Sequence, residues 1–242
     1  MSQTALNLVA ISVFLITLST LLGPLVHLSP AVPALATFMI LGIATLDSFS
    51  LQGQGGTIFL DWISSFSKEY RDRILHHEAG HFLIAHLLGI PATGYTLSAW
   101  EAWKQGQPGQ GGVTFEDEQL ASQLAAGKIG VQMLDRYCTV WMAGIAAETV
   151  VFNSAEGGTD DLGKLKGVLT TLGFTESICQ QKQRFYALQA KNLLEENWSS
   201  YQALVKAMEQ RASVEDCQNA IASGGAQPIA NSGVKPIASA GL

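Results

Sequence analysis

The first 46 residues of the chain contain no aspartate, glutamate, lysine or arginine. Two apolar runs fill this segment, over residues 5–28 and 30–46, and only a Ser-Pro turn separates them. Because a helix needs about 20 apolar residues to cross a bilayer, we expect a tight two-helix hairpin through a membrane. A cleaved signal peptide is the alternative for the first run, although the positively charged start typical of such a peptide is missing.

Three basic residues follow the apolar runs, namely Lys68, Arg71 and Arg73. Basic residues that flank membrane spans are retained on the cytoplasmic side. We therefore expect an integral membrane protein whose remaining chain lies on the cytoplasmic side or its organellar equivalent, such as the stroma.

The overall composition excludes two classes of protein. The net charge is −6, so the chain lacks the basic surface of a nucleic-acid-binding protein and no nucleic-acid partner is expected. Its three cysteines, Cys138, Cys179 and Cys217, are far apart and odd in number. They form neither a disulfide framework nor a zinc ribbon, and a reducing compartment is expected.

Four regions follow from the composition. We expect a membrane anchor with two transmembrane helices over 1–50, a Gly-rich linker over 51–61, a mainly α-helical domain over 62–221 and a disordered tail over 222–242. The fold class is therefore mainly α, with the helical hairpin preceding an α-helical domain.

Two segments of the helical domain have distinct patterns. "ATGYTLSAW" (92–100) and "GGVTF" (111–115) are rich in β-formers and predict a small β-hairpin with a Gly-rich loop. Residues 119–152 are rich in alanine and leucine at helical spacing and predict a buried helix or a pair of helices. A third membrane span is the alternative there, but four charged residues interrupt it, namely Lys128, Asp135, Arg136 and Glu148.

Four of the five histidines lie between residues 76 and 86, where the chain also contains the pattern H-E-x-x-H. On a helix, His77 and His81 lie one turn apart on the same face, so both can bind one tetrahedral zinc ion. Glu78 is then placed to act as the base for a zinc-bound water. His76 and His86 point elsewhere on the helix and are expected to have structural roles.

A zinc site that activates water needs a third protein ligand. The metzincin pattern requires Gly and His where this chain has Ile84 and Leu87, so that class is excluded. No histidine follows His86, which makes a carboxylate the expected ligand and a cysteine the less favoured one. The carboxylates considered are Glu148, Glu156, Asp160 and Asp161.

Four segments together resemble the peptidase domain of the FtsH family of membrane-bound zinc proteases, an M41-like peptidase. They are "HEAGH" (77–81), "AGIAAETVVF" (143–152), "GGTDDLGKL" (157–165) and "GFTE" (173–176). The resemblance covers roughly residues 68–205, and it implies that Asp161 is the third zinc ligand and that Asp160 occupies the family's preceding asparagine position.

The sequence departs from this family in two respects. Ile145 stands where the family has an arginine, and the AAA ATPase module that the family places before its protease is missing. The chain also has no G-x-x-x-x-G-K-[ST] loop for nucleotide phosphates. A separate AAA ATPase or an FtsH-type subunit is therefore an expected partner.

The resemblance implies a membrane-anchored zinc metalloendopeptidase that hydrolyses peptide bonds in proteins or peptides, uses Zn²⁺ and has no ATPase of its own. The first alternative is a non-catalytic scaffold or a regulatory subunit of an FtsH-type complex. The second is intramembrane proteolysis, although the apolar run "FLIAHLLGI" (82–90) is too short to cross a bilayer.

Overall fold

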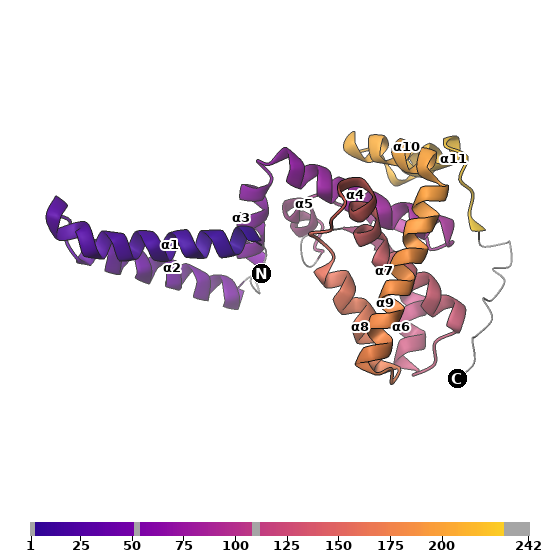
Figure 1. Cartoon of the computed structure of the whole chain (residues 1–242), viewed down its shortest axis with the longest axis horizontal. Coiled ribbons are helices and arrows are strands. Elements are labelled where there is room, and N and C mark those ends of the chain that lie inside the picture. The colour runs from indigo at the N-terminus through magenta and orange to yellow at the C-terminus, as the bar shows by residue number, and fades with distance from the viewer. Residues whose placement is uncertain (1–2, 51–53, 108–111, 230–242) are drawn as a thin grey trace. The chain divides into compact units, whose positions relative to one another are not determined.

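A computed structural model describes residues 3–50, 54–107 and 112–229. The expected fold class is confirmed, because the structure is 75% helical and 3% strand with one small antiparallel sheet (Figure 1). The chain forms two compact units, the first from residues 1–70 with 98–111 and the second from residues 71–97 with the chain from 112 onward.

The first unit begins with a helical hairpin. Helices α1 (Gln3–Leu22) and α2 (Ala31–Ser50) lie side by side, and the short 3-10 helix η1 (Gly23–Val26) begins the turn between them (Figure 1). The backbone N–H of Leu28 donates to the carbonyl of Gly23 at 2.8 Å and closes the turn.

One helix in the described part of the chain is long and apolar enough to cross a membrane. Its best 18-residue window, Val9–Val26, has a mean hydropathy of 2.2, and only 6% of that window is buried. The apolar stretch of α2, Ala31–Asp47, is shorter. A signal sequence has the same length and hydropathy, so the alternative of a cleaved signal peptide also agrees with this helix.

Most of the range expected to be a linker is helix α3 (Gln54–Ser64). Two glycines in its first turn disfavour a helix, but the side chain of Asp47 accepts hydrogen bonds from the N–H groups of Gly55 and Gly56, both at 2.9 Å. A carboxylate near the end of α2 thus satisfies two of the amides that every helix start leaves without partners.

Helix α5 (Ala99–Lys104) begins where the sequence predicted strand. Ser98 caps it, because its Oγ accepts a hydrogen bond from the N–H of Glu101 at 3.2 Å. The segment Ser-Ala-Trp-Glu therefore acts as a helix start, which the β-forming residues around it obscured.

The second unit contains most of α4 (Lys68–Leu87), which begins in the first unit, and the predicted β-hairpin. Strands β1 (Ala92–Tyr95) and β2 (Val113–Phe115) pair antiparallel, with an irregularity between Ala92 and Gly94. The β-hairpin prediction is confirmed, while the connection between its strands also contains α5.

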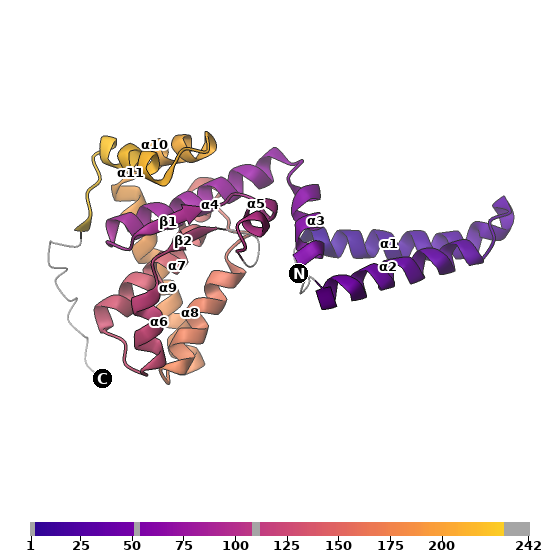
Figure 2. The same ribbon diagram turned by 180° about the vertical axis from the view of Figure 1, so that it is seen from behind.

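Six further helices complete the second unit (Figure 2). They are α6 (Glu118–Ala125), α7 (Val131–Phe152), α8 (Thr159–Thr171), α9 (Glu176–Glu196), α10 (Trp198–Glu209) and α11 (Val214–Ser223). Helices α6 and α7 are the pair expected over 119–152, and most of α7 is buried against α8, α9 and the rest of the core.

Helices α4 and α7 approach closely through small residues. A Cβ atom on Gly80 would lie 2.6 Å from the carbonyl oxygen of Ala143 and 2.7 Å from the Cβ of Ala147. This crossing brings the histidines of α4 against α7.

The C-terminal prediction is only partly within the described residues. Helix α11 continues to Ser223, and the N–H of Ala226 donates to Ser200 Oγ at 3.0 Å. Residues 230–242 of the expected tail lie outside the described residues.

Candidate metal centre

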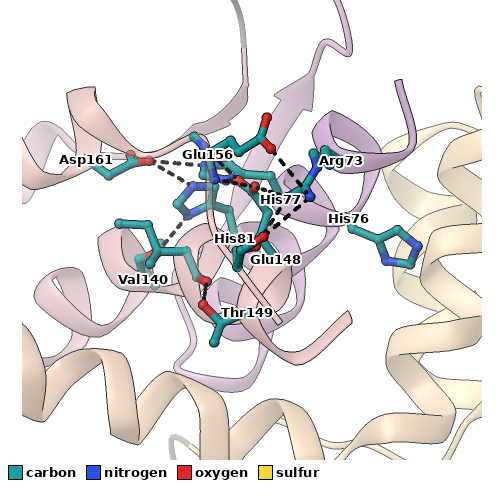
Figure 3. A network of polar contacts seen from close by, with 12 residues as sticks. Arg73, His76, His77, His81, Val140, Glu148, Thr149, Glu156 and Asp161 are labelled. Carbon is teal, nitrogen blue, oxygen red and sulfur yellow. Dashed lines mark hydrogen bonds and ion pairs between the residues drawn. The ribbon is translucent and has the colours of Figure 1, made fainter. Parts of the chain in front are cut away.

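Three side chains of the second unit converge at one point (Figure 3). His77 and His81 come from α4, and Asp161 comes from the first turn of α8. The Nε2 atoms of the histidines lie 3.2 Å and 3.3 Å from Asp161 Oδ2. All three residues are buried, and their donor atoms lie within 4.8 Å of one another, so the group can hold a metal ion.

The other nitrogen of each imidazole ring has its own partner. His77 Nδ1 lies 2.7 Å from Glu148 Oε1, and His81 Nδ1 lies 2.7 Å from the backbone carbonyl oxygen of Val140. Because a carbonyl oxygen only accepts, His81 Nδ1 carries the proton of this hydrogen bond, which leaves Nε2 as the atom that faces Asp161. Partners of this kind fix the orientation of metal-binding histidines.

Glu148 on α7 links the elements that carry the converging side chains. Its carboxylate has an exposed fraction of 2% and accepts the N–H groups of Glu156 at 2.9 Å and Gly157 at 3.2 Å. Arg73 Nη1 lies 3.5 Å from Glu148 Oε2. Burial alone would raise the pKa of Glu148, but the hydrogen bond with His77 and these amides lower it. Glu148 therefore joins α4, α7 and the loop that precedes α8.

The four carboxylates considered from the sequence have different places in the structure. Asp161 lies in the converging group and Glu148 lies behind His77. Asp160 is exposed, and Glu156 has a 70% exposed side chain that pairs with Arg73 at 3.5 Å. No further group of three metal-binding side chains is found among the residues that the structure describes.

His76 and His86 lie outside the converging group, as helical geometry predicted. His76 Nδ1 lies 2.8 Å from the hydroxyl of Tyr201, and its ring meets Phe152 edge-on at 5.5 Å. His86 is half-buried near the end of α4, and burial lowers its pKa.

The charges of the converging side chains shift one another's pKa values. Burial alone would lower the pKa of His77, but the hydrogen bonds with Asp161 and Glu148 raise it to about 10. Burial alone would raise the pKa of Asp161, but His81 and His77 hold it far below its ordinary value. Two imidazole nitrogens and one carboxylate oxygen thus meet in a buried group that could hold a metal ion.

Glu78 lies beside this group without belonging to it. Its Oε2 accepts a hydrogen bond from the N–H of Val113 at 3.0 Å, so the start of β2 holds the carboxylate. A Cβ atom on Gly112, whose φ is +139°, would lie 3.2 Å from the same oxygen. The glycine therefore permits both the backbone conformation and the close approach of the strand to Glu78.

A second glycine makes room for a histidine. A Cβ atom on Gly144 of α7 would collide with the imidazole ring of His77. The sequence did not reveal this contact, the role of Val140 or the role of Arg73. The one available signal was Glu148, because it is the one charged residue in the apolar run 137–152 and a buried charge needs a partner.

Comparisons with protein-family models and with curated proteins found no match to this chain.

Proposed function

We propose that this chain is a membrane-anchored zinc metalloendopeptidase that resembles the peptidase domain of the FtsH family. The observation that supports this most is the convergence of His77 Nε2, His81 Nε2 and Asp161 Oδ2, with each Nδ1 engaged by a separate partner. In this proposal the three side chains bind zinc. Three protein ligands are the number found in zinc sites that activate water.

The bound zinc would supply an acidic water, whose pKa falls to about 7, and would polarise the scissile carbonyl. Glu78 acts as the base in this proposal, because it neighbours His77 in sequence and its carboxylate is positioned by the N–H of Val113. The carboxylate takes one proton as the water oxygen bonds to the carbonyl carbon. It then delivers that proton to the amine nitrogen as the C–N bond breaks.

The same proposal places the helical hairpin in a membrane. Helix α1 meets the length and hydropathy requirements, and Lys68 follows the hairpin on the flank expected to be cytoplasmic or stromal. Protein or peptide substrates and a separate AAA ATPase or FtsH-type subunit are the partners that we propose.

Replacement of the base tests the mechanism. We expect Glu78→Gln in the full chain to keep its zinc and to cleave unfolded casein about 10²–10⁴-fold more slowly, which is the usual contribution of a general base. Glu69→Gln makes the same change at an exposed position of the same helix and should cleave normally. Metal analysis and cleavage with and without a chelator are the measurements.

Two results would contradict the proposal in different ways. Cleavage by Glu78→Gln at the rate of the unmodified chain would exclude Glu78 as the base. A zinc-loaded, unmodified chain that cleaves no casein would favour the scaffold or regulatory alternative.

A further inference from the structure

A cluster of exposed aromatic side chains lies in the first unit. We call it the aromatic platform, and it consists of Phe59 and Trp62 on α3, Phe66 just after α3, and Trp100 and Trp103 on α5. These side chains are between 44% and 71% exposed. The ring of Trp62 lies 6.2 Å from that of Phe59 and 5.2 Å from that of Phe66, and Trp100 stacks on Trp103 at 5.0 Å.

A buried carboxylate holds the two helices of the platform together. Asp61, which is 5% exposed, accepts hydrogen bonds from the N–H of Ala99 at 2.9 Å and from the hydroxyl of Tyr70 at 3.0 Å. Helices α3 and α5 also pack against each other. Asp61 thus faces inward, whereas Phe59 and Trp62 on the same helix face outward. The two aromatic groups of the platform are thus carried by helices that a buried polar contact joins.

The platform is attached directly to the helical hairpin. Asp47 near the end of α2 binds the first amides of α3, and α3 also contacts α1. In both views α3 runs across the direction of α1 and α2 rather than along it (Figures 1 and 2). A helix at the open end of a membrane hairpin, lying across it, occupies the level of the lipid headgroups.

We propose that the aromatic platform rests in the headgroup layer of the same bilayer that the hairpin crosses. This inference rests on the membrane anchoring in the proposed function. Tryptophan is enriched at that level because its ring is apolar and its N–H is polar. A helix with an apolar aromatic face lies in the plane of the interface with that face buried in it. The occupant of this surface is therefore lipid.

The net charge of the first unit indicates which lipid headgroups it would bind. The unit contains two lysines, Lys68 and Lys104, and four carboxylates, Asp47, Asp61, Glu69 and Glu101, so its net charge is −2. Attraction to anionic headgroups therefore contributes little. The platform should bind through apolar contact, and zwitterionic phosphatidylcholine should suffice at both low and high salt.

Quenching of tryptophan fluorescence by brominated lipid tests this directly. The full chain is reconstituted in phosphatidylcholine vesicles brominated either near the headgroup end or near the terminal methyl of the acyl chain. Trp141→Phe/Trp198→Phe leaves only Trp62, Trp100 and Trp103. The matched control, Trp62→Phe/Trp100→Phe/Trp103→Phe, leaves only Trp141 and Trp198 in the second unit.

We expect bromine near the headgroups to reduce the emission of the first variant roughly twofold or more, and bromine near the methyl end to reduce it less, as for interfacial tryptophans. The control variant should show no quenching by either lipid. In the unmodified chain, the same lipid should quench part of the emission, namely that of Trp62, Trp100 and Trp103. Because this chain carries no substitution, partial quenching there excludes a folding defect of the variants as the cause.

The outcomes separate this inference from the anchoring itself. If the chain floats with the vesicles and resists alkaline extraction but the three tryptophans are not quenched, the hairpin is in the bilayer and the platform inference is wrong. The platform would then face a protein partner or a second copy. If the chain neither floats nor resists extraction, both the anchoring and the platform inference fail.

Discussion

Helices α1 and α7 are similar in length and in apolar content, yet their surroundings differ. Helix α1 has 20 residues, no charge and side chains such as Phe14 and Leu21 that are 62% and 74% exposed. Helix α7 has 22 residues, and its Val140 and Met142 are fully buried. Protein covers the apolar surface of α7, whereas the described residues of the first unit leave most of α1 uncovered.

Hydroxyl groups are satisfied locally in both regions, since Thr139 and Thr149 of α7 also donate to the carbonyl four residues earlier, and the two regions differ in a buried carboxylate. In α1 and α2, the hydroxyls of Thr17, Thr20, Thr37 and Thr45 each donate to the carbonyl four residues earlier in the same helix. In α7, the carboxylate of Glu148 finds its partners on α4 and on the loop before α8. A helix in lipid must satisfy its polar groups locally, whereas a helix in a protein core can use tertiary partners.

We expect the largest effect from a charge placed in α1, because it should oppose membrane insertion, whereas a charge on α7 should not. Leu15→Arg puts an arginine on a 53% exposed position near the middle of α1, where membrane insertion becomes less favourable by about 2.5–3.5 kcal/mol. Val131→Arg makes a similar change at a 74% exposed position at the start of α7 and should have no such effect. The measurement is the fraction of the chain that resists alkaline extraction. Equal extraction of the two variants would show that α1 is not a membrane span.

Gly144→Ala tests whether the close approach of α4 and α7 is needed for metal binding. The added Cβ collides with the ring of His77, so we expect the zinc affinity to fall by more than about 100-fold, beyond the usual loss of an outer partner. Gly167→Ala on α8 has open space around its Cβ and should stabilise the fold by about 0.4–1 kcal/mol. Chelator competition and thermal unfolding measure these effects. Normal zinc binding by Gly144→Ala would argue that His77 is not a ligand.

The tertiary partner of His77 is tested by Glu148→Gln. The change removes the charge that holds His77 Nδ1 and the amides of Glu156 and Gly157, and we expect zinc affinity to fall about 10–100-fold. Glu156→Gln is the control, because the Glu156 side chain is 70% exposed. Zinc competition with a chelator compares the two variants. If both lose the same zinc affinity, Glu148 does not contribute to metal binding.

The smallest effect is expected at Arg73. Its guanidinium lies 3.2 Å from the carbonyl oxygen of Ser154 and 3.5 Å from both Glu148 and Glu156, so it fastens α4 to the loop before α8. We expect Arg73→Met to weaken zinc binding about tenfold or less, and Arg73→Lys to recover part of the loss because it keeps the charge. If Arg73→Lys binds no more tightly than Arg73→Met, the charge of Arg73 does not contribute.

Local patterns in the sequence predicted the elements that depend on nearby residues. The apolar runs gave the helical hairpin, the β-formers gave β1 and β2, and the four-residue spacing of His77 and His81 placed both rings on one face. Residues of one helix keep their relative directions whatever the rest of the chain does. The residues alone left four carboxylates open as the third group, and only the family resemblance pointed to Asp161. Zinc, catalysis by Glu78 and membrane insertion stay predictions.

Only the tertiary structure decided which of those carboxylates joins the histidines and which lies behind them. Asp161 and Glu148 are both buried acidic residues far from His77 in sequence, yet one faces its Nε2 and the other its Nδ1. That choice depends on how closely α4 and α7 cross, which Gly80 and Gly144 permit. Helix α3 likewise depends on Asp47 from a neighbouring helix. Such contacts depend on which elements pack against each other in the folded chain, and the residues next to each partner in the sequence do not specify this.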